Sequence, residues 1–157
     1  MSAVSRVCVI VGAGPGLGGS VAFKFAKEGY KVFVLSRTEP SVALTLTKLS
    51  DAGLSATFIA TDASNKAAVE AAFGEIGKVD VLVYNASSGG GGRGGGILDI
   101  SAETVQSSMD ISVIGALLCV QAVLPGRGAE RLHPLHRRDC CDPRLSRRRS
   151  VCNGQAR

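Results

Sequence analysis

The sequence predicts an α/β fold, a doubly wound parallel sheet with helices on both faces. Short runs rich in β-branched residues alternate with longer segments in which apolar residues recur at helical spacing, which is the pattern of βαβ units. A glycine-rich turn separates the first such run from the first helical segment. The alternation stops after a fourth strand and a long helix, so we expect the fold to be truncated at that point.

Each element follows from a local signal. Strands are predicted at residues 6–11, 31–35, 55–61 and 79–84, where β-branched and apolar residues dominate. Helices are predicted at residues 17–28, 40–52, 69–76 and 102–123. Leu17, Val21 and Phe25 share one face of the first helix, and Pro40 suits the first turn of the second. We expect a strand order of 3-2-1-4 with right-handed crossovers.

The glycine-rich turn runs from Gly12 to Gly18 and reads Gly-Ala-Gly-Pro-Gly-Leu-Gly. Glycines permit a tight turn and let a pyrophosphate approach the backbone, while the helix that follows offers free N–H groups to that anion. The position between a strand and a helix is the one that a dinucleotide-binding Rossmann domain requires. The alternative is a tight strand-to-helix connection with no ligand.

Four features together resemble the short-chain dehydrogenase/reductase family. Gly12, Gly16 and Gly18 fit its G-x-x-x-G-x-G spacing, and Asp62 stands just after the third strand. Residues 84–87, Tyr-Asn-Ala-Ser, are similar to its Asn-Asn-Ala-Gly motif, and residues 113–125 are similar to its long central helix. The resemblance covers residues 6–125.

This resemblance implies an oxidoreductase that transfers hydride to or from a carbonyl or alcohol, and a homo-oligomeric parent protein. It divides the chain into a partial NAD(P)-binding Rossmann domain, residues 1–125, and an Arg-rich tail, residues 126–157. The implied cofactor-binding residues are Gly12, Gly14, Gly16, Leu17, Gly18, Ser36, Arg37, Asp62, Ala63, Asn85 and Ala86.

The end of the second strand predicts NADP rather than NAD. An acidic residue there would bond the ribose 2′-hydroxyl of NAD, but the sequence has Ser36 and Arg37. An arginine pairs with the 2′-phosphate of NADP through charge-assisted hydrogen bonds. The alternative is an ordinary surface arginine.

The catalytic residues that the family implies are missing from these 157 residues. The family uses a Ser and a Tyr-x-x-x-Lys set after the long helix, with the Tyr as general acid/base. The last tyrosine here is Tyr84 and the last lysine is Lys78. Ser112 stands where the family places an Asn that helps to hold a proton-relay water. We therefore expect no catalytic residue in this chain, and a non-catalytic dinucleotide-binding or regulatory protein is the alternative function.

The composition changes abruptly at Pro125. Residues 1–124 have a net charge of −1, whereas residues 125–157 carry nine Arg, no Lys and a net charge of +6. Read one base later, the codons of residues 133–142 permit Ile-Leu-Phe-Thr-Gly-Ala-Thr-Ala-Ala-Ile, which is similar to the family's fifth strand. We predict that the tail is frameshifted and disordered.

Other interpretations of the tail are disfavoured. Cys140 and Cys141 are adjacent rather than in C-x-x-C spacing, which is a poor template for zinc, so no metal is expected. Basic residues such as Arg147–Arg149 would suit nucleic acid, but no aromatic residue accompanies them. No nucleic-acid partner is therefore expected.

No membrane or secretory segment is expected. The apolar stretch at residues 111–125 is shorter than the roughly 18 residues that a span needs, and the first six residues do not form a secretory signal. Five cysteines without a spaced framework argue against a disulfide scaffold. These features favour a cytoplasmic protein.

Overall fold

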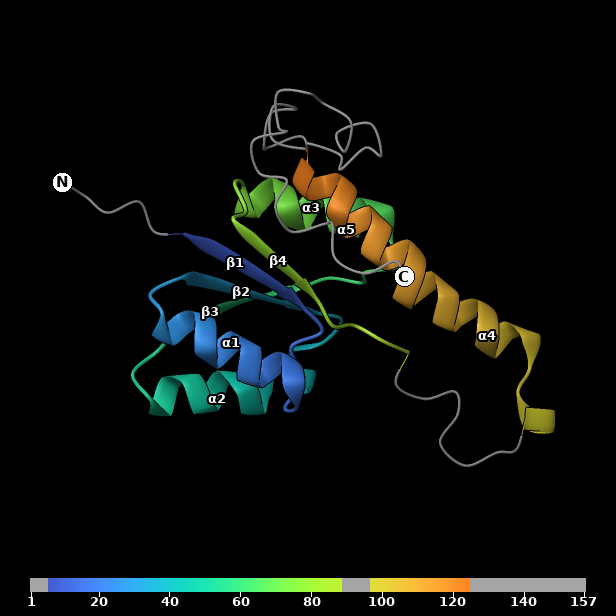
Figure 1. Ribbon diagram of the computed structural model, residues 1–157, viewed down its shortest axis with the longest axis horizontal. Coiled ribbons are helices and arrows are strands. Elements are labelled where there is room, and N and C mark those ends of the chain that lie inside the picture. The colour runs from blue at the N-terminus through green and yellow to red at the C-terminus, as the bar shows by residue number, and fades with distance from the viewer. Residues whose placement is uncertain (1–5, 89–96, 125–157) are drawn as a thin grey trace, which may run out of the picture. The chain divides into compact units, whose positions relative to one another are not determined.

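The computed structural model describes residues 6–88 and 97–124, and it shows a four-stranded parallel sheet flanked by helices (Figure 1). The strands are β1 (Val7–Val11), β2 (Lys31–Ser36), β3 (Ala56–Ala60) and β4 (Val81–Tyr84). Their order is β3-β2-β1-β4, as the sequence predicts. Val9 is the Cα partner of both Phe33 and Leu82, so β1 lies at the centre of the sheet.

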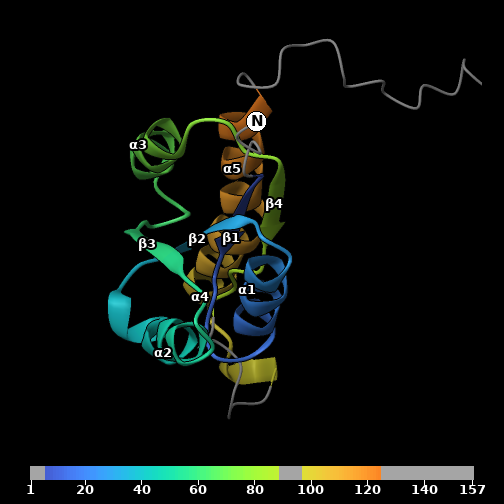
Figure 2. The same ribbon diagram turned by 90° about the vertical axis from the view of Figure 1, so that its left-hand side faces the viewer.

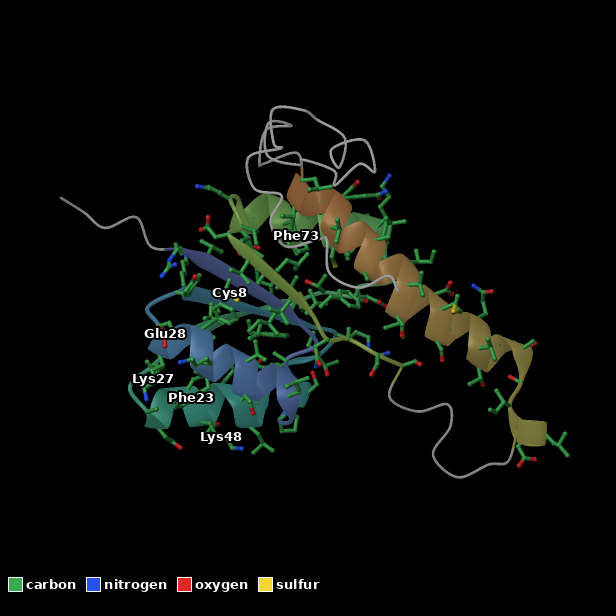
Figure 3. All side chains as sticks on the ribbon, viewed as in Figure 1. Cys8, Phe23, Lys27, Glu28, Lys48 and Phe73 are labelled. Atoms are coloured by element: carbon green, nitrogen blue, oxygen red, sulfur yellow. The ribbon has the colours of Figure 1, made fainter. Side chains whose placement is uncertain are left out.

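Helices cover both faces of the sheet, which confirms the doubly wound class (Figure 2). α1 (Leu17–Lys27) and α2 (Ala43–Asp51) lie on one face. α3 (Lys66–Ile76) and α5 (Gly115–Val123) lie on the other. Alternate side chains of β1 pack into two hydrophobic cores, one on each face of the sheet. Cys8 belongs to the core beneath α1, and Val9 belongs to the core beneath α3. Cys8 and Phe73, labelled in Figure 3, belong to these opposite cores.

The predicted apolar face of the first helix is confirmed for Val21 and Phe25, which pack against the core, but not for Leu17. Leu17 is 71% exposed, and Val21 and Phe25 are only partly buried. The buried residues of α1 are Gly18, Ala22 and Ala26. Small side chains on that face let the helix backbone approach the sheet closely, while Val21 and Phe25 pack at the edge of the contact.

The second predicted helix begins later than expected. A 3-10 turn spans Glu39–Ser41 with Pro40 in its first positions, and α2 starts only at Ala43. Pro40 therefore lies in the first turn of a 3-10 segment and not, as predicted, in the first turn of α2. Val42, fully buried, links the two.

The long helix is continuous over Ala102–Val123 but changes its winding. α4 (Ala102–Met109) leads into a π-helical segment, Asp110–Ile114, and then into α5. The sequence predicts the helix but not the π segment.

By length and composition this 22-residue helix could cross a membrane. The length of the apolar stretch at residues 111–125 therefore does not decide the question, because the helix begins nine residues earlier.

One face of this helix packs on the domain and the other carries apolar residues exposed to solvent. Gly115 and Cys119 are buried, whereas Ile114, Leu117 and Val120 are between 44% and 50% exposed. Burial raises the pKa of both the Cys8 and the Cys119 thiols to about 11, so both keep their protons and pack as small apolar side chains. The predictions for residues 126–157 lie outside the described residues.

Candidate functional site

A cleft of about 290 Å³ opens at the carboxyl ends of the four strands, where parallel sheets bind their ligands. All eleven cofactor-binding residues expected from the sequence line this one cleft. The cleft is also lined by Val11, Leu35, Ser41, Thr61, Ser87 and Ile111, which the sequence analysis did not select. Four of these follow from strand position, because Val11, Leu35 and Thr61 lie at or next to strand ends and Ser87 continues the chain beyond Asn85.

The glycine-rich turn is held from β2 and from the end of β4. Gly12 donates its N–H to the Leu35 carbonyl oxygen at 2.9 Å, and the Asn85 side-chain amide donates to the Gly12 carbonyl oxygen at 2.8 Å. The φ of Gly12 is +86°, a conformation that strongly favours glycine. A Cβ on Gly12 would lie 2.6 Å from the Ala86 backbone nitrogen. The turn therefore requires glycine for both its conformation and its packing.

The amino end of α1 faces this cleft without a capping side chain. Gly16 is its N-cap, no side chain accepts a hydrogen bond there, and its first turn has no acidic residue. In contrast, Asn65 caps α3 and Ser101 caps α4. The Gly19 N–H is bonded to the Gly14 carbonyl oxygen, so the N–H groups of Leu17 and Gly18 and the partial positive charge of the helix are what α1 offers an anion in the cleft.

Arg37 extends from the end of β2 at the rim of the cleft. It is exposed and makes no ion pair within the described part of the chain. The hydroxyls of Ser36 and Ser41 lie 2.5 Å apart beside it, and Ser41 donates its proton to the Thr38 carbonyl oxygen. The Ser36 hydroxyl is therefore the donor of that pair, and a guanidinium and two hydroxyls gather where β2 ends.

Asp62 lines the same cleft as Arg37 and lies in the loop after β3. Its Oδ1 accepts hydrogen bonds from the Ser64 hydroxyl at 2.7 Å and the Ser64 N–H at 2.9 Å. These bonds, and then the charge of Arg37, hold the pKa of Asp62 below its usual range. Asp62 is therefore ionised at neutral pH, and its other oxygen remains available as an acceptor.

The π-helical segment brings a backbone group to the other side of the cleft. The Tyr84 hydroxyl donates a hydrogen bond to the carbonyl oxygen of Ile111, a residue that lines the cleft. Burial is the main cause that raises the Tyr84 pKa to about 12, so the hydroxyl keeps its proton. Gly115 is required here, because a Cβ would lie 2.5 Å from the Tyr84 hydroxyl. The motif at residues 84–87 includes Tyr84 but does not predict this contact.

No cluster of three or more potential metal ligands occurs among residues 6–88 and 97–124. The chemistry of the cleft is instead that of an anion and nucleotide site. It combines backbone N–H groups, a helix amino end, an arginine and an ionised aspartate.

The family model for the short chain dehydrogenases matches residues 6–130. This chain belongs to the short-chain dehydrogenase family. The match ends close to the composition change at Pro125. Members of this family are oxidoreductases that use NAD or NADP.

Curated relatives of this short-chain dehydrogenase include enzymes with different substrates. It is 35% identical over 128 residues to the monensin polyketide synthase putative ketoacyl reductase of Streptomyces virginiae, covering 79% of this chain and 48% of the relative. It is 30% identical over 118 residues to D-xylose 1-dehydrogenase of Caulobacter vibrioides, covering 75% and 46%. The chain thus spans about half the length of these relatives.

Solved structures support the same fold. Actinorhodin polyketide ketoreductase with NADPH, in its F189W form, superposes with a TM-score of 0.70 at 31% identity, covering 79% of this chain and 48% of that one. A metagenomic short-chain oxidoreductase in complex with NADP superposes with a TM-score of 0.68 at 26% identity, covering 77% and 56%.

Proposed function

We propose that residues 1–125 are the NADP-binding half of a short-chain dehydrogenase that transfers hydride to or from a carbonyl or alcohol. The observation that carries this proposal is the position of Arg37, with Ser36 and Ser41, at the end of β2 beside the glycine-rich turn. No acidic residue occupies the end of β2, where it would bond the ribose of NAD.

Each part of the cleft suits one part of the cofactor. Gly14, Gly16 and Gly18 and the amino end of α1 would hold the pyrophosphate. Arg37 would hold the 2′-phosphate beside the paired hydroxyls of Ser36 and Ser41, and Asp62 would meet the adenine ring. Bound NADPH supplies the hydride, while this chain's own residues bind and orient it. The NADPH and NADP complexes among the structural neighbours support this assignment.

The substrate class that we propose is a small carbonyl or alcohol compound. A ketoacyl reductase and a xylose dehydrogenase are both relatives, so similarity at this level does not choose between substrates.

We further propose a cytoplasmic protein whose parent is a homo-oligomer, without a nucleic-acid or membrane partner. In that assembly a second protein surface would cover Ile114, Leu117 and Val120, which are exposed in this chain.

We expect the 157-residue chain to bind cofactor without turning it over. It has no Tyr-x-x-x-Lys set, and a positioned general acid/base contributes about 10²–10⁴-fold. An assay of NADPH oxidation with generic ketones and aldehydes should stay at the rate of the buffer control, while the melting temperature rises with NADPH. Turnover that follows the purified chain through chromatography would contradict this expectation. The non-catalytic binding protein is therefore our second candidate function.

We also propose that residues 126–157 arise from a frameshift. The family match ends at residue 130, and the shifted codons of residues 133–142 permit a strand-like string similar to the family's fifth strand. Sequencing of the genomic DNA and the transcript should reveal one inserted or deleted base near codon 126. An unbroken frame in both, with no long alternative frame, would show that the tail is genuine.

A further inference from the structure

Thr45 lies directly behind the glycine-rich turn, on the first turn of α2. It is one of only two polar residues that are buried among the described residues, with 2% of its surface exposed. Its hydroxyl donates to the Ala13 carbonyl oxygen at 3.0 Å and lies 3.3 Å from the Gly14 carbonyl oxygen. Thr45 does not line the cleft, and the proposed function gives it no role.

The three carbonyl groups at the start of the turn are all held by named donors. Asn85 holds the Gly12 carbonyl, Thr45 holds the Ala13 carbonyl, and the Gly19 N–H donates to the Gly14 carbonyl at 2.9 Å. The C=O and N–H of one trans peptide point in opposite directions. Holding the Ala13 carbonyl against α2 therefore turns the Gly14 N–H away from α2.

The packing around Thr45 leaves little freedom for the hydroxyl. A Cβ on Gly19 would lie 2.6 Å from the Thr45 Oγ1 and 2.8 Å from the Gly14 carbonyl oxygen. Gly19 therefore lets α1 approach α2 at this point. Phe23 of α1 and Lys48 of α2, labelled in Figure 3, lie farther along the same two helices and line a groove with Thr45.

We propose that Thr45 is a positioning residue for the cofactor pyrophosphate. Its hydroxyl fixes the carbonyl group of Ala13 and thereby the Gly14 N–H of the same peptide, whereas the next peptide has no N–H because residue 15 is proline. Ser41, four residues earlier, lines the cleft beside Arg37. The segment from Ser41 to Thr45 thus connects the 2′-phosphate side of the cleft to its pyrophosphate side. This inference rests on the proposed function.

The test compares Thr45→Val, which keeps the branched shape without the hydroxyl, with Thr45→Ser, which keeps the hydroxyl. NADPH reaches both the turn and Arg37, whereas adenosine 2′-monophosphate lacks the pyrophosphate. We expect Thr45→Val to weaken NADPH binding about tenfold, because it leaves the buried Ala13 carbonyl without its partner. Adenosine 2′-monophosphate should bind it as it binds the wild type. Thr45→Ser should keep both affinities, and Thr47→Val, on the exposed side of α2, is the matched control.

A second readout does not need the cofactor. Amide hydrogen exchange of Gly19 in the free chain should speed up in Thr45→Val and stay near the wild-type rate in Thr45→Ser. If the wild type binds neither nucleotide, the proposed function fails and this exchange still decides the role of Thr45. Unchanged exchange and NADPH affinity in Thr45→Val would overturn the inference, and so would equal losses in Thr45→Val and Thr45→Ser. Should Thr45→Val not fold, Thr45→Ala replaces it in both measurements.

Discussion

Replacing Gly12 with alanine should destabilise the domain and abolish cofactor binding. An L side chain at a φ of +86° is strained, and its Cβ would lie 2.6 Å from the Ala86 nitrogen and 2.9 Å from the Asn85 carbonyl carbon. Both neighbours are backbone atoms that cannot rotate away. Strain and overpacking together should cost about 3 kcal/mol of the free energy of unfolding.

The matched control is Gly74→Ala. Gly74 lies within α3, has no atom within 4 Å of the position of a new Cβ, and is not in the cleft. Alanine is favoured over glycine in a helix interior by roughly 1 kcal/mol, so this variant should unfold at a higher denaturant concentration. Denaturant melts and NADPH titrations of both variants check the prediction. A Gly12→Ala protein that melts and binds like the wild type would contradict the structure of the turn.

Replacing Arg37 with aspartate should reverse the cofactor preference. Wild-type Arg37 would make charge-assisted hydrogen bonds to the 2′-phosphate of NADPH, each worth roughly 1.5–3 kcal/mol. Aspartate removes them and repels the phosphate, while it accepts from the ribose hydroxyls of NADH. We expect NADPH affinity to fall by about 100-fold and NADH to become the tighter ligand.

Lys27→Asp makes the same change in net charge at the end of α1, away from the cleft. It should leave the preference for NADPH unchanged, which separates a local contact from the effect of overall charge. Equal affinities of the wild type for NADPH and NADH would refute the assignment of Arg37. A preference that survives in Arg37→Asp would refute it as well.

The sequence predicted the sheet order and the placement of the cleft residues because these follow from local signals. A strand followed by the turn from Gly12 to Gly18 determines where α1 begins, and parallel strands bring their carboxyl ends to one edge. Ser36, Asp62 and Asn85 each end or follow a strand, so their convergence follows from the topology alone.

The contacts of Thr45, Tyr84 and Ile111 could not be predicted in this way. Thr45 meets Ala13 across 32 residues, and Tyr84 meets Ile111 across 27. Each contact depends on how closely a helix approaches a neighbouring element, which is decided by small residues: Gly19 where α1 meets α2, and Gly115 where the long helix meets Tyr84 of β4. Helical periodicity also does not report a π segment, because the apolar pattern continues through residues 110–114. Periodicity also does not report the buried small residues of α1, because it selects large apolar residues whereas the close contact with the sheet uses Gly18, Ala22 and Ala26.

The most direct test of the central claim is an NMR titration of the ¹⁵N-labelled chain with NADPH. If residues 1–125 are the NADP-binding half of a short-chain dehydrogenase, backbone amide signals should shift in the glycine-rich turn, at Ser36 to Ser41, at Asp62 and Ala63, and at Asn85 and Ala86. Signals from α3 and the outer face of α5 should stay in place, and NADH should cause the same pattern more weakly and without the Arg37 shift. Absent shifts at millimolar NADPH, or shifts centred on the groove between α3 and α5, would contradict the account.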